Sequence, residues 1–330
     1  MKNGIATMTG LLFLASGPAM AQTVDGAVTE NEVYLGSAPT ALAGTLTLPP
    51  GGGPFPAVVL VHGSGPQDRD ESIGPNRPFR DLAAGLAAHG IAVLRYEKRT
   101  RTYPMSFANR PFTVDDETVD DALVAVDLLR KTRQIDGRRI VVIGHSLGAM
   151  LAPRIAERDG NVAGIVLLAG ATTESLLDMV DRQMNYLKSV PGADTLAIAR
   201  QQQAIAPLAA RIRALTPADS ASTQLLLGAP PAYWLDLNAY DPLAVTKRLP
   251  IPVLVLHGGR DYQLTREGFE QWRSELAGQN NVTFRLYPSL NHYFIHGDQP
   301  SVPSEYALPG NVSREVIDDV AAWINGITPR

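Results

Sequence analysis

A serine flanked by glycines offers the clearest chemistry in the sequence. The motif Gly144-His145-Ser146-Leu147-Gly148 follows an apolar run, Arg139–Ile143, and opens a helical pattern, Ser146–Arg158. A serine at a sharp strand-to-helix turn must adopt a strained backbone, and flanking glycines relieve the crowding. The helix N-terminus behind it offers N–H groups to a developing oxyanion. The motif therefore predicts Ser146 as an acyl-transfer nucleophile; the alternative is a glycine-rich turn with an ordinary capping serine.

A serine hydroxyl is a weak nucleophile unless a base lies within hydrogen-bond reach. Of the six histidines, His292 lies in the loop after the last strand-like run, Val282–Leu286, and is the predicted base. His296, a few residues further on, is the alternative. We expect His145 to point away from Ser146. We expect structural or surface roles for the remaining three: His62, His89 and His257.

The base needs an acid that holds its tautomer, and this acid should come from another strand end, between the serine and the histidine in chain order. Asp261 follows the apolar run Ile251–Leu256 and is the predicted acid. An alternative role for Asp261 is to cap the helical stretch that follows it. Two further candidates for the acid do not follow a strand directly: Asp241 and Asp298.

The oxyanion of a tetrahedral intermediate needs two N–H donors. His62-Gly63-Ser64-Gly65-Pro66 follows the strand-like run Ala57–Val61, where a loop can supply the second donor. We predict the backbone N–H groups of Ser64 and Leu147 as the pair. The Ser64 hydroxyl is expected to belong to a simple turn, because no helix-opening elbow follows it.

The sequence gives no pattern for a metal or a cofactor. Asp68, Asp70 and Glu71 lack the spacing of a calcium loop, and we expect them to form a salt-bridge network with Arg69 within their loop. No phosphate-binding loop or dinucleotide fingerprint occurs. The chain has no cysteine, so a thiol nucleophile is excluded. We predict that the chain uses neither a metal nor a cofactor.

Strand-like and helical segments alternate along the chain, which predicts a doubly wound, mostly parallel sheet with helices on both faces, the α/β class. The strand-like runs are largely continuous and apolar, as in buried parallel strands. The predicted strands are Glu32–Leu35, Ala41–Leu48, Ala57–Val61, Ile91–Arg95, Arg139–Ile143, Val162–Leu168, Ile251–Leu256 and Val282–Leu286. The predicted helices between and after them are Pro78–His89, Val114–Thr132, Ser146–Arg158, Arg266–Leu276 and Ser313–Ile327.

One interval, 169–250, contains no strand-like run but has helical patterns at Leu176–Leu187 and Ala197–Leu215. We predict an inserted helical cap at about 172–245, over the carboxyl edge of the sheet. Ordinary helical packing elsewhere on the domain is the alternative. Four large side chains of this interval could line an acyl pocket or simply pack the cap against the core: Tyr186, Tyr233, Trp234 and Leu235.

The N-terminus has the pattern of a secretory signal peptide. Lys2 precedes the apolar run Leu11–Ala15, and Ala19-Met20-Ala21 provides small residues for cleavage. We predict a signal peptide at 1–21, a mature domain at 22–330, and a periplasmic or secreted protein; a disordered or strand-forming N-terminus is the alternative. The formal net charge is −4, with no basic stripe, so we expect no nucleic-acid partner. No other segment is long enough to span a membrane.

These motifs together resemble the α/β-hydrolase superfamily, and within it the dienelactone-hydrolase-like bacterial serine esterases. The resemblance covers nearly all of the mature chain. It rests on the serine elbow and on five further segments: 62–70, 94–99, 257–263, 290–292 and 309–323. It implies serine-dependent hydrolysis of small or medium carboxylic esters through an acyl-enzyme, with a small-molecule ester as substrate and no obligate protein partner. Alternatives are a peptidase or amidase, a thioesterase, and a non-catalytic binding protein of the same fold.

Overall fold

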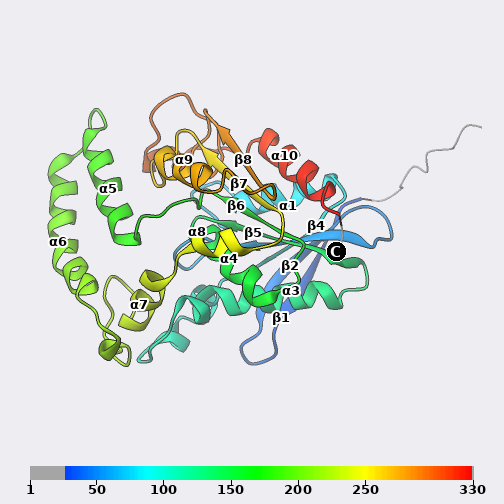
Figure 1. The fold of residues 1–330 in the computed structure, drawn as a ribbon, viewed down its shortest axis with the longest axis horizontal. Coiled ribbons are helices and arrows are strands. Elements are labelled where there is room, and N and C mark those ends of the chain that lie inside the picture. Colours follow the sequence, from blue (N-terminus) through cyan, green and yellow to red (C-terminus); the bar gives the residue numbers. More distant parts are fainter. Residues whose placement is uncertain (1–26, 329–330) are drawn as a thin grey trace, which may run out of the picture.

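Eight strands form one sheet at the centre of the molecule, in the order β1-β2-β4-β3-β5-β6-β7-β8 (Figure 1). The computed structural model describes residues 27–328, so the predicted signal peptide lies outside the described residues. The strands are β1 (Thr29–Leu35), β2 (Leu42–Leu48), β3 (Phe55–Val61), β4 (Ala92–Tyr96), β5 (Ile135–His145), β6 (Gly164–Leu168), β7 (Val253–Gly258) and β8 (Val282–Tyr287). The pairs β1–β2 and β2–β4 are antiparallel, and the other neighbours are parallel.

The inner parallel strands are buried on both faces, which explains their continuous apolar sequences, whereas the edge strand β8 is partly exposed. Every residue of β6 is buried, and so is every residue of β7. The sequence prediction of a doubly wound, mostly parallel sheet is confirmed. All eight predicted strands are present, with ends that differ by a few residues. Because β3, β5, β7 and β8 are parallel, the loops that follow them meet at one edge of the sheet.

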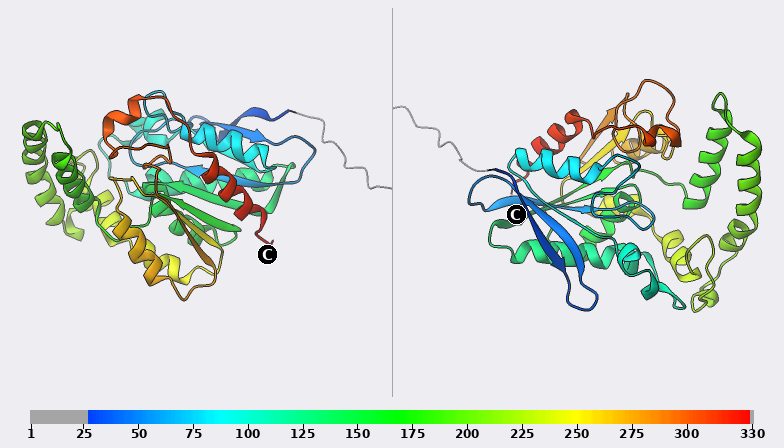
Figure 2. Two further views of the ribbon diagram at one scale, coloured as in Figure 1. Left: turned by 90° about the horizontal axis from the view of Figure 1, so that it is seen from above. Right: turned by 180° about the vertical axis from the view of Figure 1, so that it is seen from behind.

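Helices cover both faces of the sheet (Figure 2). On one face α1 and α10 pack together so closely that a Cβ at Gly85 would lie 2.5 Å from the Ile317 side chain. Helices α3, α4 and α8 lie on the other face. The helices of the main body are α1 (Pro78–Ala88), α2 (Arg99–Thr102), α3 (Asp120–Lys131), α4 (Leu147–Asp159), α8 (Pro242–Arg248), α9 (Arg266–Glu275) and α10 (Arg314–Asn325).

Between β6 and β7 the chain forms helices only, as the interval without strand-like runs predicts. They are α5 (Leu176–Ser189), α6 (Thr195–Arg213) and α7 (Pro231–Ala239), followed by α8. Helices α5 and α6 form a hairpin that projects beyond the edge of the sheet (Figures 1 and 2). We call α5 and α6 the helical hairpin. Helices α7 and α8 were not predicted individually, because each is short and begins at a proline, a residue that in sequence usually indicates the end of a helical pattern.

One predicted helix differs in form. The stretch predicted as Val114–Thr132 begins with a π-helical turn, Asp115–Val119, which then continues into α3. Single π-helical turns commonly occur at functional positions in helices. This turn buries the side chain of Glu117, a residue that the amphipathic pattern alone would place at the surface.

Candidate active site

The backbone at Ser146 has the strained form expected of a nucleophile elbow. Ser146 lies between the last residue of β5 and the first residue of α4, with φ +52° and ψ −116°. The flanking glycines are required by close packing. A Cβ at Gly144 would lie 2.1 Å from the Gly148 carbonyl oxygen, and one at Gly148 would lie 2.2 Å from the Val61 oxygen. The strand, turn and helix therefore force the serine side chain out at the carboxyl edge of the sheet.

The predicted base and acid lie together. His292 Nδ1 is 2.7 Å from Asp261 Oδ2, and both side chains are almost completely buried. The other carboxylate oxygen, Oδ1, accepts the backbone N–H groups of Gln263 and Leu264. Burial alone would raise the pKa of Asp261, but the nearby His292 imidazole and these hydrogen bonds hold it below its ordinary value. An ionised Asp261 thus keeps the proton on Nδ1 and leaves Nε2 as an acceptor.

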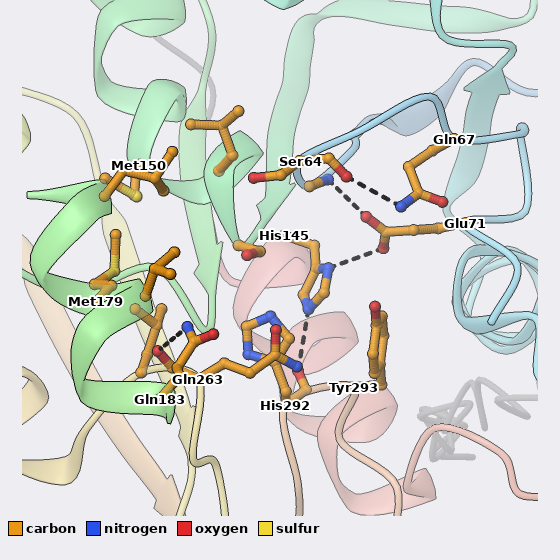
Figure 3. A pocket seen from close by; sticks show the side chains of 16 residues that line it. Ser64, Gln67, Glu71, His145, Met150, Met179, Gln183, Gln263, His292 and Tyr293 are labelled. Carbon is orange, nitrogen blue, oxygen red and sulfur yellow. Dashed lines mark hydrogen bonds and ion pairs between the residues drawn. The ribbon is translucent and has the colours of Figure 1, made fainter. Parts of the chain in front are cut away.

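Ser146 and His292 line the same cavity, which has a volume of about 280 Å³ (Figure 3). One wall comes from loops at the carboxyl edge of the sheet, and the other comes from α5. The residues of the second wall and of the cavity floor are largely apolar: Leu147, Met150, Leu176, Met179, Val180 and Leu264. The polar side chains of the lining include three amides, Gln67, Gln183 and Gln263, together with Glu71, His145 and Tyr293. Such a cavity suits an uncharged ligand with an apolar group.

The predicted oxyanion donors are in place around this cavity. Ser64 and Leu147 both line it, and Leu147 is the first residue of α4, where a helix has unpaired N–H groups. In the part of the chain that the structure describes, neither backbone N–H donates to another protein group. Both are therefore available to an oxygen atom of a bound ligand.

One part of the site was predicted wrongly. Glu71 does not join a salt-bridge network of the loop with Arg69, whose guanidinium contacts Glu97 instead. Glu71 has a positive φ of +50° and turns inward, where it is 2% exposed. Its Oε1 accepts the Gly63 N–H at 2.6 Å, and its Oε2 lies 2.9 Å from His145 Nδ1 (Figure 3). Because Glu71 lies in a run of charged residues, the local sequence does not indicate that its side chain turns inward.

His145 also lines the cavity, a position that the sequence analysis did not assign to it. Its Nε2 donates to the main-chain oxygen of His292 at 3.0 Å, so the elbow holds the loop of the base. Burial would lower the pKa of His145, but the charge of Glu71 and the hydrogen bond to it outweigh burial and raise this pKa. Glu71 and His145 form a buried ion pair in the wall of the cavity.

The alternative base and acids lie elsewhere. The side chain of His296 is 64% exposed, and its nearest carboxylate, Asp298, is 86% exposed. Asp241 accepts the Ala244 N–H at 2.9 Å and caps α8. Thr265, rather than Asp261, caps α9. None of the three alternatives lines the cavity with Ser146.

The remaining histidines have the structural or surface positions predicted for them. His62 is buried between the rings of Phe79 and Tyr96, and burial lowers its pKa to about 4. His257 stacks on Phe269 under the sheet edge. His89 lies at the surface beside Asp318.

The four large residues proposed for the acyl pocket do not line the cavity: Tyr186, Tyr233, Trp234 and Leu235. Tyr186 donates to the Ser301 oxygen, and Trp234 donates to the Leu226 oxygen. Tyr233 donates to Glu117 at 2.9 Å. The alternative role, packing of the helical interval against the core, is therefore the observed one for Tyr186, Tyr233 and Trp234.

Within residues 27–328, no group of three or more histidine, aspartate or glutamate side chains is arranged to hold a metal ion. Over the same residues, no helix combines the length and the apolar character needed to cross a lipid bilayer.

Comparison with known proteins identifies the fold and the family. Residues 58–303 match the model of the alpha/beta hydrolase family. The chain therefore belongs to the α/β-hydrolase family. Esterase EstD from Thermotoga maritima is 43% identical over 283 residues, which are 86% of this chain and 65% of that protein. This chain thus spans just under two thirds of that relative's length.

Solved structures share the fold at low sequence identity. Pyrococcus furiosus esterase Pf2001 superposes with a TM-score of 0.56 and 17% identity, covering 91% of each chain. An acylaminoacyl peptidase from Pyrococcus horikoshii gives 0.57 and 13% identity, covering 92% of this chain and 43% of its own. Because esterases and a peptidase share it, the fold alone does not select the bond that is cleaved.

Proposed function

We propose that this protein is a serine hydrolase that cleaves carboxylic esters of small or medium acyl chain through an acyl-enzyme intermediate. The observation that carries the proposal is the buried Asp261–His292 pair, with its 2.7 Å contact, at the cavity that also holds the strained elbow of Ser146. The likeness to esterase EstD supports an ester as the substrate.

The site supplies each proton transfer that this reaction needs. His292 Nε2 takes the proton of the Ser146 hydroxyl as its oxygen attacks the ester carbonyl carbon. Asp261 stabilises the imidazolium, and the N–H groups of Ser64 and Leu147 bind the oxyanion. His292 then protonates the departing alcohol. Water, deprotonated by the same imidazole, attacks the acyl-enzyme and releases the acid and Ser146.

The cavity favours a small substrate. Its volume of about 280 Å³ lies just below the roughly 300–1,000 Å³ of small-molecule pockets. Helix α5 supplies apolar side chains at one wall, among them Met179 and Val180. In this proposal the helical interval at about 172–245 acts as a cap that limits the length of the acyl chain.

Export is a further part of the proposal. The charged start, apolar run and small residues of 1–21 support a signal peptide and a periplasmic or secreted location. Expression of the full chain in a Gram-negative host, followed by N-terminal sequencing of the periplasmic fraction, should give a protein that begins at Gln22. Retention of Met1 in a cytoplasmic product would contradict it.

Hydrolysis of p-nitrophenyl esters of increasing acyl length tests the reaction. The parent protein should hydrolyse short or medium esters, and Ser146→Ala should lower kcat by a factor on the order of 10⁶. Ser64→Ala is the matched control, since it removes a hydroxyl from the same cavity but keeps the backbone N–H; it should retain most of the activity. A folded parent that hydrolyses no ester would overturn the proposal and direct attention to peptides and thioesters.

A further inference from the structure

A buried lysine that the reaction does not use lies behind the loop of the oxyanion donor. Lys98 follows β4, and its side chain is 2% exposed. A buried charge is costly unless it is paired and hydrogen-bonded. The Lys98 ammonium has two such partners: Glu117 Oε1 at 3.0 Å and the Gly63 carbonyl oxygen at 2.8 Å. The contact with Gly63 connects this cation to the active site.

That contact fixes the direction of the neighbouring N–H. The Gly63 carbonyl and the Ser64 N–H belong to one peptide group, and in a planar trans peptide they point in opposite directions. With its oxygen held toward Lys98, the group directs the Ser64 N–H to the other side. Ser64 lines the cavity, and its N–H has no protein acceptor within the described residues.

The other side of Gly63 is held as well. Its own N–H donates to Glu71 Oε1 at 2.6 Å, so the peptide groups before and after the Gly63 Cα are both bonded to buried charged side chains. A glycine would otherwise be the most mobile residue of this loop. The two hydrogen bonds therefore hold Gly63 in one backbone orientation, although a glycine could adopt many.

The counterion of Lys98 is fixed by the helical interval. Glu117 is 6% exposed in the π-helical turn, and its Oε2 accepts the Tyr233 hydroxyl at 2.9 Å. Tyr233 belongs to α7. A continuous series of contacts thus runs from α7 through Glu117 and Lys98 to Gly63.

We propose that Lys98 is a positioning residue for the oxyanion hole, which aims and polarises the Ser64 N–H through the Gly63 carbonyl. The inference rests on the proposed acyl-transfer function. Donors that are fixed before the reaction stabilise the oxyanion without reorganisation, so the effect of Lys98 falls on the transition state rather than on substrate binding. A charged partner on the carbonyl also strengthens the N–H of the same peptide as a donor.

The test is the double variant Lys98→Met/Glu117→Gln. It removes the cation without leaving an unpaired buried carboxylate, and the glutamine oxygen can still accept from Tyr233. The matched control is Arg130→Met/Asp159→Asn, which removes a part-buried ion pair between α3 and α4 that does not line the cavity. We expect kcat to fall about 10- to 100-fold in the Lys98 variant, with KM within about threefold of the parent. The control should keep the parent kcat.

Two ketones of one acyl length provide a second measurement that does not depend on turnover. A trifluoromethyl ketone forms a tetrahedral adduct with Ser146, whose oxyanion occupies the hole, whereas the methyl ketone binds as the ground state does. The Lys98 variant should lose about 10- to 100-fold in affinity for the first and little for the second. Circular dichroism and thermal unfolding verify that each variant is folded.

The outcomes separate the two proposals. A parent that hydrolyses no ester contradicts the proposed function, while the ratio of the two ketone affinities still decides the role of Lys98. A folded Lys98 variant with unchanged kcat and an unchanged ratio overturns the inference. Equal losses for both ketones, or equal losses in the Arg130 control, would also overturn it, because they indicate a general structural role. A parent that binds the two ketones equally overturns both proposals.

Discussion

The loops at the carboxyl edge of the sheet and the helical hairpin form opposite walls of one cavity, but they are stabilised differently. In the loops, Asp261, His292 and Glu71 are buried and hydrogen-bonded to one another or to the main chain. In the hairpin, Arg213 joins α6 to α5 through Asp178, and both side chains are about half exposed. Exposed pairs of this kind contribute ~0–1 kcal/mol. With the proposed function, we therefore expect the reaction to depend on the loops and the choice of substrate to depend on the hairpin.

The largest expected effect belongs to the loop wall. Asp261→Asn should keep the fold but lower kcat by a factor of about 10⁴, because the amide stabilises the wrong tautomer of His292. Steady-state hydrolysis of a preferred ester measures the loss. The control is Asp298→Asn at the exposed alternative acid, which should retain parental kcat. Equal activity of the two variants would mean that Asp261 is not the orienting acid.

The next effect tests the buried ion pair of Glu71 and His145 in the wall of the cavity. Glu71→Gln should lower the free energy of unfolding by about 3 kcal/mol, the low end for breaking a buried pair, since glutamine still accepts from Gly63. The pKa of Glu71 is lowered and that of His145 is raised. The ion pair therefore makes its full contribution to the free energy of unfolding between pH 4.5 and pH 6.5, which are the ordinary pKa values of the two side chains. Its contribution decreases as pH rises through the raised pKa of His145.

Urea unfolding at pH 5.5–6 and at pH 9 measures this dependence. Asp159→Asn is the control, because its partner Arg130 stays charged over the whole range. The loss in Glu71→Gln should shrink at high pH, whereas the loss in the control should not. A constant loss in Glu71→Gln would show that His145 carries no charge in the folded protein.

A smaller effect concerns His62, which burial keeps neutral. Its pKa falls from 6.5 to about 4 on folding, so between these values the unfolded chain binds one proton more. The stability of the parent should therefore fall with decreasing pH, and His62→Gln should reduce that slope by about 1.4 kcal/mol per pH unit. Chemical unfolding between pH 4.5 and 6.5 gives the slopes. His89→Gln, at the half-exposed position, is the comparison; an equal reduction there would refute burial of His62 as the cause.

The smallest effect belongs to the hairpin wall. Met179 on α5 lines the cavity, and Met179→Ala removes apolar contact with the acyl chain. We expect the preferred ester to lengthen and selectivity between neighbouring chain lengths to change by about three- to tenfold, near the low end for one methylene. The ratio of kcat/KM values over the ester series measures it. Leu196→Ala on the exposed side of α6 should change nothing. A loss of kcat for all esters in Met179→Ala would contradict the expectation that the hairpin wall affects only the choice of substrate.

The proposed catalytic residues could be predicted because each follows a parallel strand. Ser146, Asp261 and His292 come after β5, β7 and β8, and the parallel geometry brings those strand ends together. Chain order and strand ends were therefore the grounds on which they were chosen from several histidines and aspartates. The inner parallel strands could be predicted as well, since their apolar runs are short and rich in β-branched residues, which favours a strand over a helix.

The buried charged residues that hold the Gly63 loop could not be predicted in this way. Glu71 lies in a run of charged residues, and only its positive φ turns it into the core. Lys98 reads as part of a basic surface segment, and the carboxylate that makes its burial possible comes from a π-helical turn that periodicity does not reveal. Both contacts with Gly63 depend on tertiary positions, for which local sequence carries no signal.

The exposed outer face of α6 has a practical consequence. Leu196 lies at the start of this helix with 61% of its surface exposed, and the chain contains no cysteine. A Leu196→Cys variant would carry one thiol in the entire molecule, and a spin label or fluorophore attached there would report on a single known position. Distance measurements from that label to a spin-labelled inhibitor on Ser146 would show how far the helical hairpin moves when the cavity is filled.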